Sequence, residues 1–128
     1  MIHPQNPWLG YSPDGLLFEN DILKSLEIKC PIQGIHSRAT DIITSLNYIH
    51  MTGGTYMLKE KHKYYGQVQC GMHLTNAEEC FFVIFASYNN SYVLIRVLRN
   101  EDFIIKMFTS LHHVYFNYFL AYIHFYVM

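Results

Sequence analysis

One stretch constrains the fold of this chain more than any other, because it joins a tight turn to two strands. Ser12 to Pro31 reads SPDGLLFENDILKSLEIKCP. Asp14 lies in a turn, since the proline before it restricts φ and the glycine after it tolerates positive φ. Apolar runs within residues 15–19 and 23–30 flank the polar Glu-Asn-Asp, which is typical of a hairpin loop. The stretch therefore predicts a β-hairpin.

Two charged side chains share one face of the second strand. Side chains alternate along a strand, so Glu27 and Lys29 point the same way. The opposite face carries Leu26, Ile28 and Cys30. We expect the charged pair to face a cleft and not bulk solvent, with Leu26 and Ile28 buried behind it.

The hairpin also returns Asp14 to the side of Glu27, although the two are 27 − 14 = 13 positions apart. Taken singly, an SPDG turn and a Glu-x-Lys strand are usually structural. Together they suit divalent-metal chemistry, because Mg²⁺ takes one or two carboxylates and keeps its other positions for water and phosphate oxygens. The neighbouring Lys29 can orient or deprotonate the attacking water. The pattern favours a metal-dependent phosphodiesterase site.

Three motifs in order give the chain a family resemblance. They are Pro13-Asp14 (PD), Glu27-Ile28-Lys29 (ExK), and YYGQVQCGMHLT at 64–75, which has a Tyr-x-x-Gln pair. With them, and with the flanking HPQNPWLGYSPDGL and LEIKCP, the chain resembles the PD-(D/E)XK nucleases. Within these it is similar to the YqaJ-type viral recombinases related to the phage lambda exonuclease. The resemblance covers residues 1–116 and leaves 117–128 as a divergent apolar tail.

The resemblance implies a fold and an activity. The fold is α/β, a restriction-endonuclease-like core with a mixed central sheet flanked by helices. The activity is that of a DNA exonuclease in recombination or repair, with Mg²⁺ or Mn²⁺ as cofactor. The implied metal ligands are Asp14, Glu27 and the Ile28 carbonyl. Lys29 would position the attacking water, and Gln67, with Tyr64, would help to order it.

The resemblance also implies partners, and it shows a departure from the family. DNA is the substrate, the related phage enzyme is a trimer, and a single-strand annealing protein is the expected partner. In related nucleases, earlier helices supply another acid and an arginine for the DNA 5′-phosphate, whereas this chain starts at Met1. We therefore expect the catalytic core of a longer protein or a truncated gene product. The alternatives are an inactive nuclease-fold module that binds DNA or protein, and a plain interaction domain with an accidental motif.

Composition argues against several other classes of protein. The 128 residues allow one domain at most. Three cysteines, Cys30, Cys70 and Cys80, form no CxxC pair, which argues against a disulfide framework and for a reducing compartment. The eight histidines lack the spacing of a zinc site. No apolar leader follows the first residues, so we expect an intracellular protein, cytoplasmic or nuclear depending on the host and not secreted.

Charge and hydropathy leave two stretches to interpret. The net charge is −1, whereas a basic footprint is expected of a DNA-binding protein. Lys59, Lys61, His62 and Lys63 form either a solvated loop or a phosphate-contacting patch. The apolar stretch Val114 to Met128 is short, and we expect a packed helix there and no contact with a membrane.

The remaining patterns predict alternating strands and helices. Apolar spacing predicts helices over 33–47 and 63–74. The second has a buried stripe of Tyr65, Val68 and Met72, while Gln67 and Gln69 are surface amides unless Gln67 reaches the metal site. Gly53-Gly54 marks a loop. The other predicted elements are strands at 8–11, 79–87 and 92–98, and a helix from Glu101 that Asn100 caps and that has the stripe Phe103, Met107, Leu111 and Val114.

Overall fold

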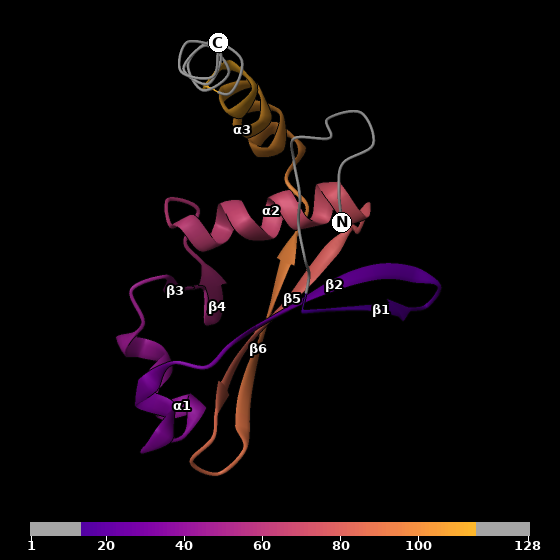
Figure 1. The fold of residues 1–128 in the computed structure, drawn as a ribbon. Coiled ribbons are helices and arrows are strands. Elements are labelled where there is room, and N and C mark those ends of the chain that lie inside the picture. Colours follow the sequence, from indigo (N-terminus) through magenta and orange to yellow (C-terminus); the bar gives the residue numbers. More distant parts are fainter. Residues whose placement is uncertain (1–13, 115–128) are drawn as a thin grey trace, which may run out of the picture.

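The computed structural model of the chain describes residues 14–114, which form an α/β fold (Figure 1). The predicted strand at 8–11 and the tail at 117–128 lie outside the described residues. The elements in chain order are β1 (Gly15–Glu19), β2 (Ile22–Lys29), the 3-10 helix η1 (Ile32–Ile35), α1 (Ala39–Ile42), the 3-10 helix η2 (Ile43–Ser45), β3 (Ile49–Thr52), β4 (Thr55–Leu58), α2 (Lys63–Thr75), β5 (Glu79–Ala86), β6 (Ser91–Leu98) and α3 (Glu101–Val114).

The main sheet has the spatial order β1-β2-β5-β6. β2 pairs with β5 in parallel, and the other two pairs are antiparallel, so the sheet is mixed, as predicted. The predicted hairpin is confirmed, since Gly15 pairs with Leu26 and Glu19 with Ile22. Its two loop residues, Asn20-Asp21, have positive φ values of 53° and 64°, as a type I′ turn requires.

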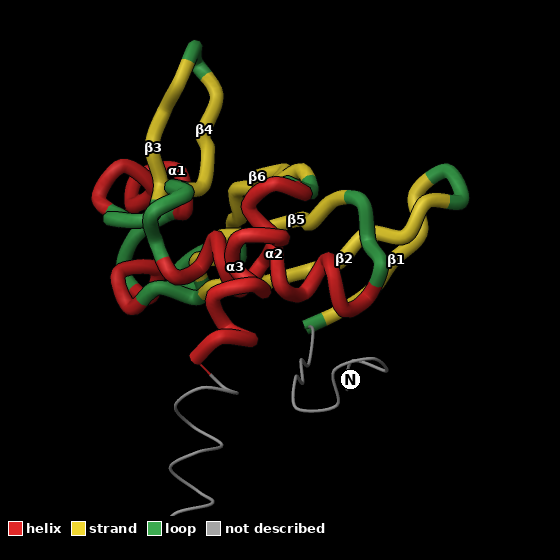
Figure 2. Tube along the Cα trace, turned by 90° about the horizontal axis from the view of Figure 1, so that it is seen from above, coloured by secondary structure: helices red, strands yellow, loops and turns green. Residues whose placement is uncertain are grey.

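A second hairpin lies where the sequence predicts only a loop. Gly53-Gly54 is the turn between β3 and β4, which pair from Ile49 with Leu58 to Thr52 with Thr55. The two glycines have φ values of 58° and 79°, which glycine adopts without steric cost. This hairpin projects from the rest of the molecule (Figure 2). Each of these strands has four residues, the shortest run in which alternation can indicate a strand, so the pattern is a weak signal.

The prediction of one helix over 33–47 is wrong, because the structure divides this region into η1, α1 and η2. Gly34 docks so closely on β5 that an added Cβ would lie 3.0 Å from the Ala86 Cα. Its carbonyl accepts a hydrogen bond from the Tyr88 N–H at 2.9 Å. Arg38 then has an extended backbone with ψ of 154°. This docking interrupts the helical path although the apolar spacing is helical.

The long helix α2 lies across the sheet and buries the predicted stripe (Figure 1). Tyr65, Val68 and Met72 are 7%, 1% and 0% exposed, so this prediction is confirmed. The face of the sheet that packs against the helices is rich in buried side chains, which include Ser25, Glu27, Cys80, Phe82, Ile84, Ile95 and Val97.

Gln69 is a buried structural amide, so its interpretation as a surface residue is wrong. Its side chain has no exposed area. Its Nε2 donates to the Leu98 carbonyl at 2.9 Å, and its Oε1 accepts from the Asn100 N–H at 2.8 Å. The two bonds fasten α2 to the end of β6 and to the start of α3.

Replacement of Gln69 by alanine is expected to lower the free energy of unfolding by about 1–3 kcal/mol, because it leaves two partly buried backbone groups without partners. Gln67→Ala, on the exposed side of the same helix, should change it by less than about 0.5 kcal/mol. Urea denaturation of the two variants measures the difference. Equal stabilities would contradict the structural role of Gln69.

The alternation along β2 is confirmed, but the prediction that Leu26 and Ile28 are buried is wrong. Glu27 is 9% exposed, whereas Ile28 is 42% exposed. Leu26 is half-buried and Cys30 is exposed. The helices pack on the face that carries Glu27 and Lys29, so the apolar residues of this strand point to the more open face. Alternation separates two faces without telling which of them a helix covers.

A network of four charged side chains occupies this more open face. Lys24 on β2 forms an ion pair with Glu79 on β5 and lies 3.6 Å from the Glu19 carboxylate on β1. Arg96 on β6 approaches Glu79 to 3.1 Å and Glu19 to 3.4 Å. Both cations lie over the Phe81 ring, at 5.7 and 4.8 Å from its centroid. The network therefore joins all four strands, and its members Lys24 and Glu79 are buried.

The last helix begins as predicted. The Asn100 Oδ1 accepts a hydrogen bond from the Phe103 N–H at 3.1 Å, which caps α3. The predicted apolar stripe is correct only in its first half. Phe103 and Met107 are partly buried, whereas Leu111 and Val114 are 40% and 54% exposed. Within residues 14–114, no helix is long and apolar enough to cross a membrane.

Candidate active site

Asp14, directly before β1, stands beside Glu27 on β2. The ladder pairs Gly15 with Leu26, so Asp14, one residue earlier, comes opposite Glu27, one residue later. The Asp14 Oδ2 also accepts a hydrogen bond from the Ile28 N–H at 2.8 Å. The structure thus brings together the residues predicted to hold a metal, while the proline of the PD motif lies outside the described residues.

The pKa of one buried thiol depends on the same two carboxylates. Cys80 on β5 has no exposed area, and burial raises the pKa of its thiol to about 12. The negative charges of Glu27 and Asp14 contribute to the same rise. All three cysteines are free. A thiol with this pKa stays protonated at neutral pH and is a poor metal ligand.

Burial disfavours the ionised form of the Glu27 carboxyl group. Burial raises its pKa above the usual value, and the positive charge of Lys29 offsets only part of that rise. Burial is the larger effect, so ionised Glu27 costs free energy in the metal-free protein. A divalent cation held by Asp14 and Glu27 would remove that cost.

The metal-free chain is expected to lose stability as the pH rises through the usual and then the raised pKa of Glu27. The folded state binds this proton more tightly than the unfolded state, so the contribution is complete at low pH and is lost as Glu27 ionises. Glu27→Gln should remove this pH dependence and be more stable than the wild type at neutral pH without metal. Urea denaturation at a series of pH values measures it. A Glu27→Gln variant that is less stable at neutral pH would contradict the argument.

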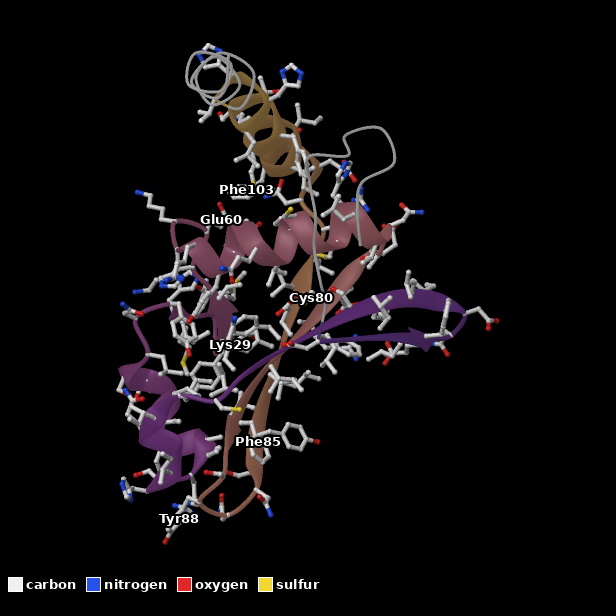
Figure 3. All side chains as sticks on the ribbon, viewed as in Figure 1. Lys29, Glu60, Cys80, Phe85, Tyr88 and Phe103 are labelled. Carbon is white, nitrogen blue, oxygen red and sulfur yellow. The ribbon has the colours of Figure 1, made fainter. Side chains whose placement is uncertain are left out.

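Lys29 is half-buried at the end of β2 (Figure 3). Its Nζ lies 4.2 Å from the centroid of the Tyr64 ring on α2. A cation over an aromatic face gains about 0.5–2 kcal/mol, depending on exposure. The structure therefore joins the strand motif to the helix motif at Lys29 and Tyr64, which are 64 − 29 = 35 positions apart.

The other residues of the helix motif lie nearer to solvent. Gln67 is exposed, and within residues 14–114 it makes no hydrogen bond to Asp14 or Lys29, so its role in ordering water stays a prediction. His62 caps α2, because its Nδ1 accepts from the Tyr64 N–H at 3.1 Å. The lysines around it, Lys59, Lys61 and Lys63, are exposed at the same end of the helix.

One residue beside the site has no signal in the sequence. Tyr48 lies in the turn before β3, and its ring meets the Tyr64 ring at a centroid distance of 4.8 Å. The residue is 8% exposed, and burial raises the pKa of its hydroxyl to about 12. No motif or periodicity includes Tyr48, so only the folded chain shows its place.

The donor set fits a magnesium-type ion. Mg²⁺ binds oxygen atoms at about 2.0–2.1 Å and needs only one or two carboxylates when water and phosphate oxygens complete its shell. Asp14 and Glu27 supply two, and the Ile28 carbonyl is next to them in the chain. Among residues 14–114, no group of three or more His, Cys, Asp or Glu side chains is arranged so that it could hold a metal ion by itself.

The fold points to a class of protein. A mixed sheet flanked by helices is the fold of nucleases that resemble lambda exonuclease. The model of the YqaJ-like viral recombinase domain matches residues 1–78. This match covers more than half of the chain, and the chain belongs to the YqaJ-like viral recombinase domain family.

Two solved structures resemble the chain. An alkaline exonuclease, LHK-Exo, from Laribacter hongkongensis is 27% identical with a TM-score of 0.69, and the match covers 96% of this chain and 55% of that one. LHK-Exo in complex with dAMP is 28% identical with a TM-score of 0.60, and the match covers 84% and 48%. The chain thus spans about half the length of these relatives. No curated protein matched it.

Proposed function

We propose that the chain is the catalytic core of a DNA exonuclease that acts in recombination or repair and depends on Mg²⁺ or Mn²⁺. The observation that carries the proposal is the pairing of Asp14 with Glu27, with Lys29 two residues further along β2. The likeness to an alkaline exonuclease supports a nuclease activity. On this proposal, residues 1–116 form the nuclease core.

Each residue of the site has a distinct task in this proposal. Asp14, Glu27 and the Ile28 carbonyl would hold the ion, which would supply a water of lowered pKa and neutralise phosphate charge. Lys29 presents a fixed positive charge to the scissile phosphate, where charge develops as the bond breaks. Gln67 contributes an amide that orders the water or a phosphate oxygen.

The same proposal extends to the substrate and the assembly. The exposed lysines at the start of α2, Lys59, Lys61 and Lys63, contact backbone phosphates of DNA without reading its sequence. The active form is a homo-oligomer that works with a single-strand annealing protein in the cytoplasm or nucleus, as the family resemblance implies.

Nucleotide release from linear duplex DNA tests the activity. We expect release that requires Mg²⁺ or Mn²⁺ and stops when a chelator is added. Isothermal titration calorimetry of Mg²⁺ tests the site separately, because the heat of binding should disappear in Asp14→Asn and Glu27→Gln. Metal binding that survives both substitutions would contradict the assigned ligands.

A second candidate function is a nuclease-fold module that binds DNA without cutting it. The observation that favours it is the group of exposed lysines Lys59, Lys61 and Lys63, which could contact DNA phosphates whether or not the site holds a metal. Such a module would retard duplex DNA in a gel, release no nucleotides, and show no heat of Mg²⁺ binding that depends on Asp14 or Glu27.

A further inference from the structure

We propose that Tyr48 is a positioning residue for Lys29 and acts through the ring of Tyr64. The inference deepens the proposed function and rests on it for its catalytic meaning. Tyr48 belongs to none of the three motifs, and it reaches the site from the turn before β3. The geometry that carries the inference is a chain of ring contacts from the core of the protein to the ammonium of Lys29.

The innermost ring of this series of contacts belongs to Phe82. Phe82 has no exposed area and pairs with Glu27 in the register of β2 and β5. The Tyr48 ring meets the Phe82 ring edge-on, at a centroid distance of 6.1 Å and an interplanar angle of 73°. The Tyr64 ring lies 6.2 Å from Phe82. The three rings thus form one aromatic cluster whose innermost member belongs to the rigid core.

Tyr48 is well placed to set the orientation of the Tyr64 ring. Their centroids are 4.8 Å apart at an interplanar angle of 73°, an edge-to-face arrangement that aromatic pairs favour. The His62 ring also contacts the Tyr64 ring, at a centroid distance of 4.7 Å. Tyr48 is itself held through its backbone, because its carbonyl accepts a hydrogen bond from the Lys59 N–H at 2.8 Å.

Lys29 needs such support because a lysine side chain has many rotamers and is held by few directional contacts. Within residues 14–114 it forms no ion pair. Its Nζ instead lies 4.2 Å from the Tyr64 ring centroid. The face of the Tyr64 ring therefore determines where the positive charge of Lys29 lies relative to Asp14 and Glu27. Tyr48 in turn determines the orientation of the Tyr64 ring.

Nuclear magnetic resonance of the full chain tests this geometry without any assay of activity. Protons above the face of an aromatic ring are shifted upfield, so the Lys29 side-chain protons should resonate upfield of ordinary lysine protons. Their signals are assigned by their loss in Lys29→Arg. In Tyr48→Leu the upfield shift should fall towards the value in Tyr64→Leu, which lacks the ring. In Tyr48→Phe, which keeps the ring and loses only the hydroxyl, the shift should stay.

Kinetics supply the second measurement. With linear duplex DNA, Tyr48→Leu should lower kcat by about 10- to 100-fold and leave KM for DNA nearly unchanged, because a displaced charge weakens the reaction and not substrate binding. Tyr48→Phe should restore most of the turnover. Tyr56→Leu is the matched control, since Tyr56 packs on the core and makes no ring contact with Tyr48 or Tyr64 among the described residues.

The outcomes separate the inference from the proposed function. A folded Tyr48→Leu variant with an unchanged Lys29 shift overturns the positioning role, whatever the activity. A wild type that shows the upfield shift and its loss in Tyr48→Leu, yet releases no nucleotides, supports the positioning and contradicts the nuclease. Circular dichroism checks folding. If Tyr48→Leu does not fold, Tyr48→Met replaces it, because the flexible thioether fills irregular space.

Discussion

Lys29→Ala is expected to lower kcat for nucleotide release by about 100- to 1,000-fold, which is the usual loss when one preorganised electrostatic contact to the transition state is removed. Lys29 stands two residues from Glu27 on the same face of β2, and its Nζ is held 4.2 Å from the Tyr64 ring centroid. The substitution removes the positive charge and leaves Asp14 and Glu27 in place. Steady-state release from linear duplex DNA at saturating Mg²⁺ measures the loss.

Lys63→Ala is the matched control for this prediction. Lys63 also approaches the Tyr64 ring, with its Nζ 5.8 Å from the centroid, but it is exposed on α2. Its loss should change the affinity for DNA at most and leave kcat within about twofold, because exposed phosphate contacts act mainly on binding. Full turnover in Lys29→Ala would refute the role of Lys29, and retained Mg²⁺ binding in that variant would confirm that the metal ligands survive.

Glu79→Ala is expected to lower the free energy of unfolding by about 3–5 kcal/mol, because it leaves a buried lysine without its main partner. Glu79 and Lys24 form an ion pair and are each 7% exposed. Glu79 also forms an ion pair with Arg96, in which Nη1 and Oε1 are 3.1 Å apart. After the substitution, Lys24 retains only Glu19 at 3.6 Å as an ion-pair partner in the described part of the chain. Urea denaturation measures the change.

Two further variants test whether the unpaired buried charge causes the loss of stability in Glu79→Ala. Asp41→Asn breaks the exposed Arg38–Asp41 pair and should cost no more than about 1 kcal/mol. The double variant Lys24→Met/Glu79→Leu replaces both buried charges with apolar side chains, so it should be more stable than Glu79→Ala alone. If the double variant is the less stable of the two, the loss in Glu79→Ala does not come from an unpaired buried charge.

The sequence was sufficient for the parts of the site that lie within one hairpin. The turn residues and the strict alternation of β2 place Asp14 beside Glu27, because the contact spans only 13 positions and follows from local geometry. The buried stripe of α2 and the Asn100 cap of α3 were equally predictable. Each depends on a period or a cap that a few consecutive residues define.

Residues brought together from distant parts of the chain were decided only by the tertiary structure. Gln69 and Gln67 are the same residue type, yet Gln69 is buried where its side chain binds backbone groups at the end of β6 and before the start of α3. Tyr48 meets Tyr64 only because the turn before β3 lies against the segment that leads into α2, where the Lys59 N–H donates to the Tyr48 carbonyl.

The sequence by itself determined which side chains of β2 share a face, and the tertiary structure determined which face is covered. Alternation depends on the backbone of one strand, so Glu27 and Lys29 must point the same way in any fold that keeps β2. Which face of the sheet is covered depends on where α2 packs in the folded protein. For this reason Glu27 is buried with a raised pKa while Ile28 remains 42% exposed, the reverse of what hydrophobicity alone predicts.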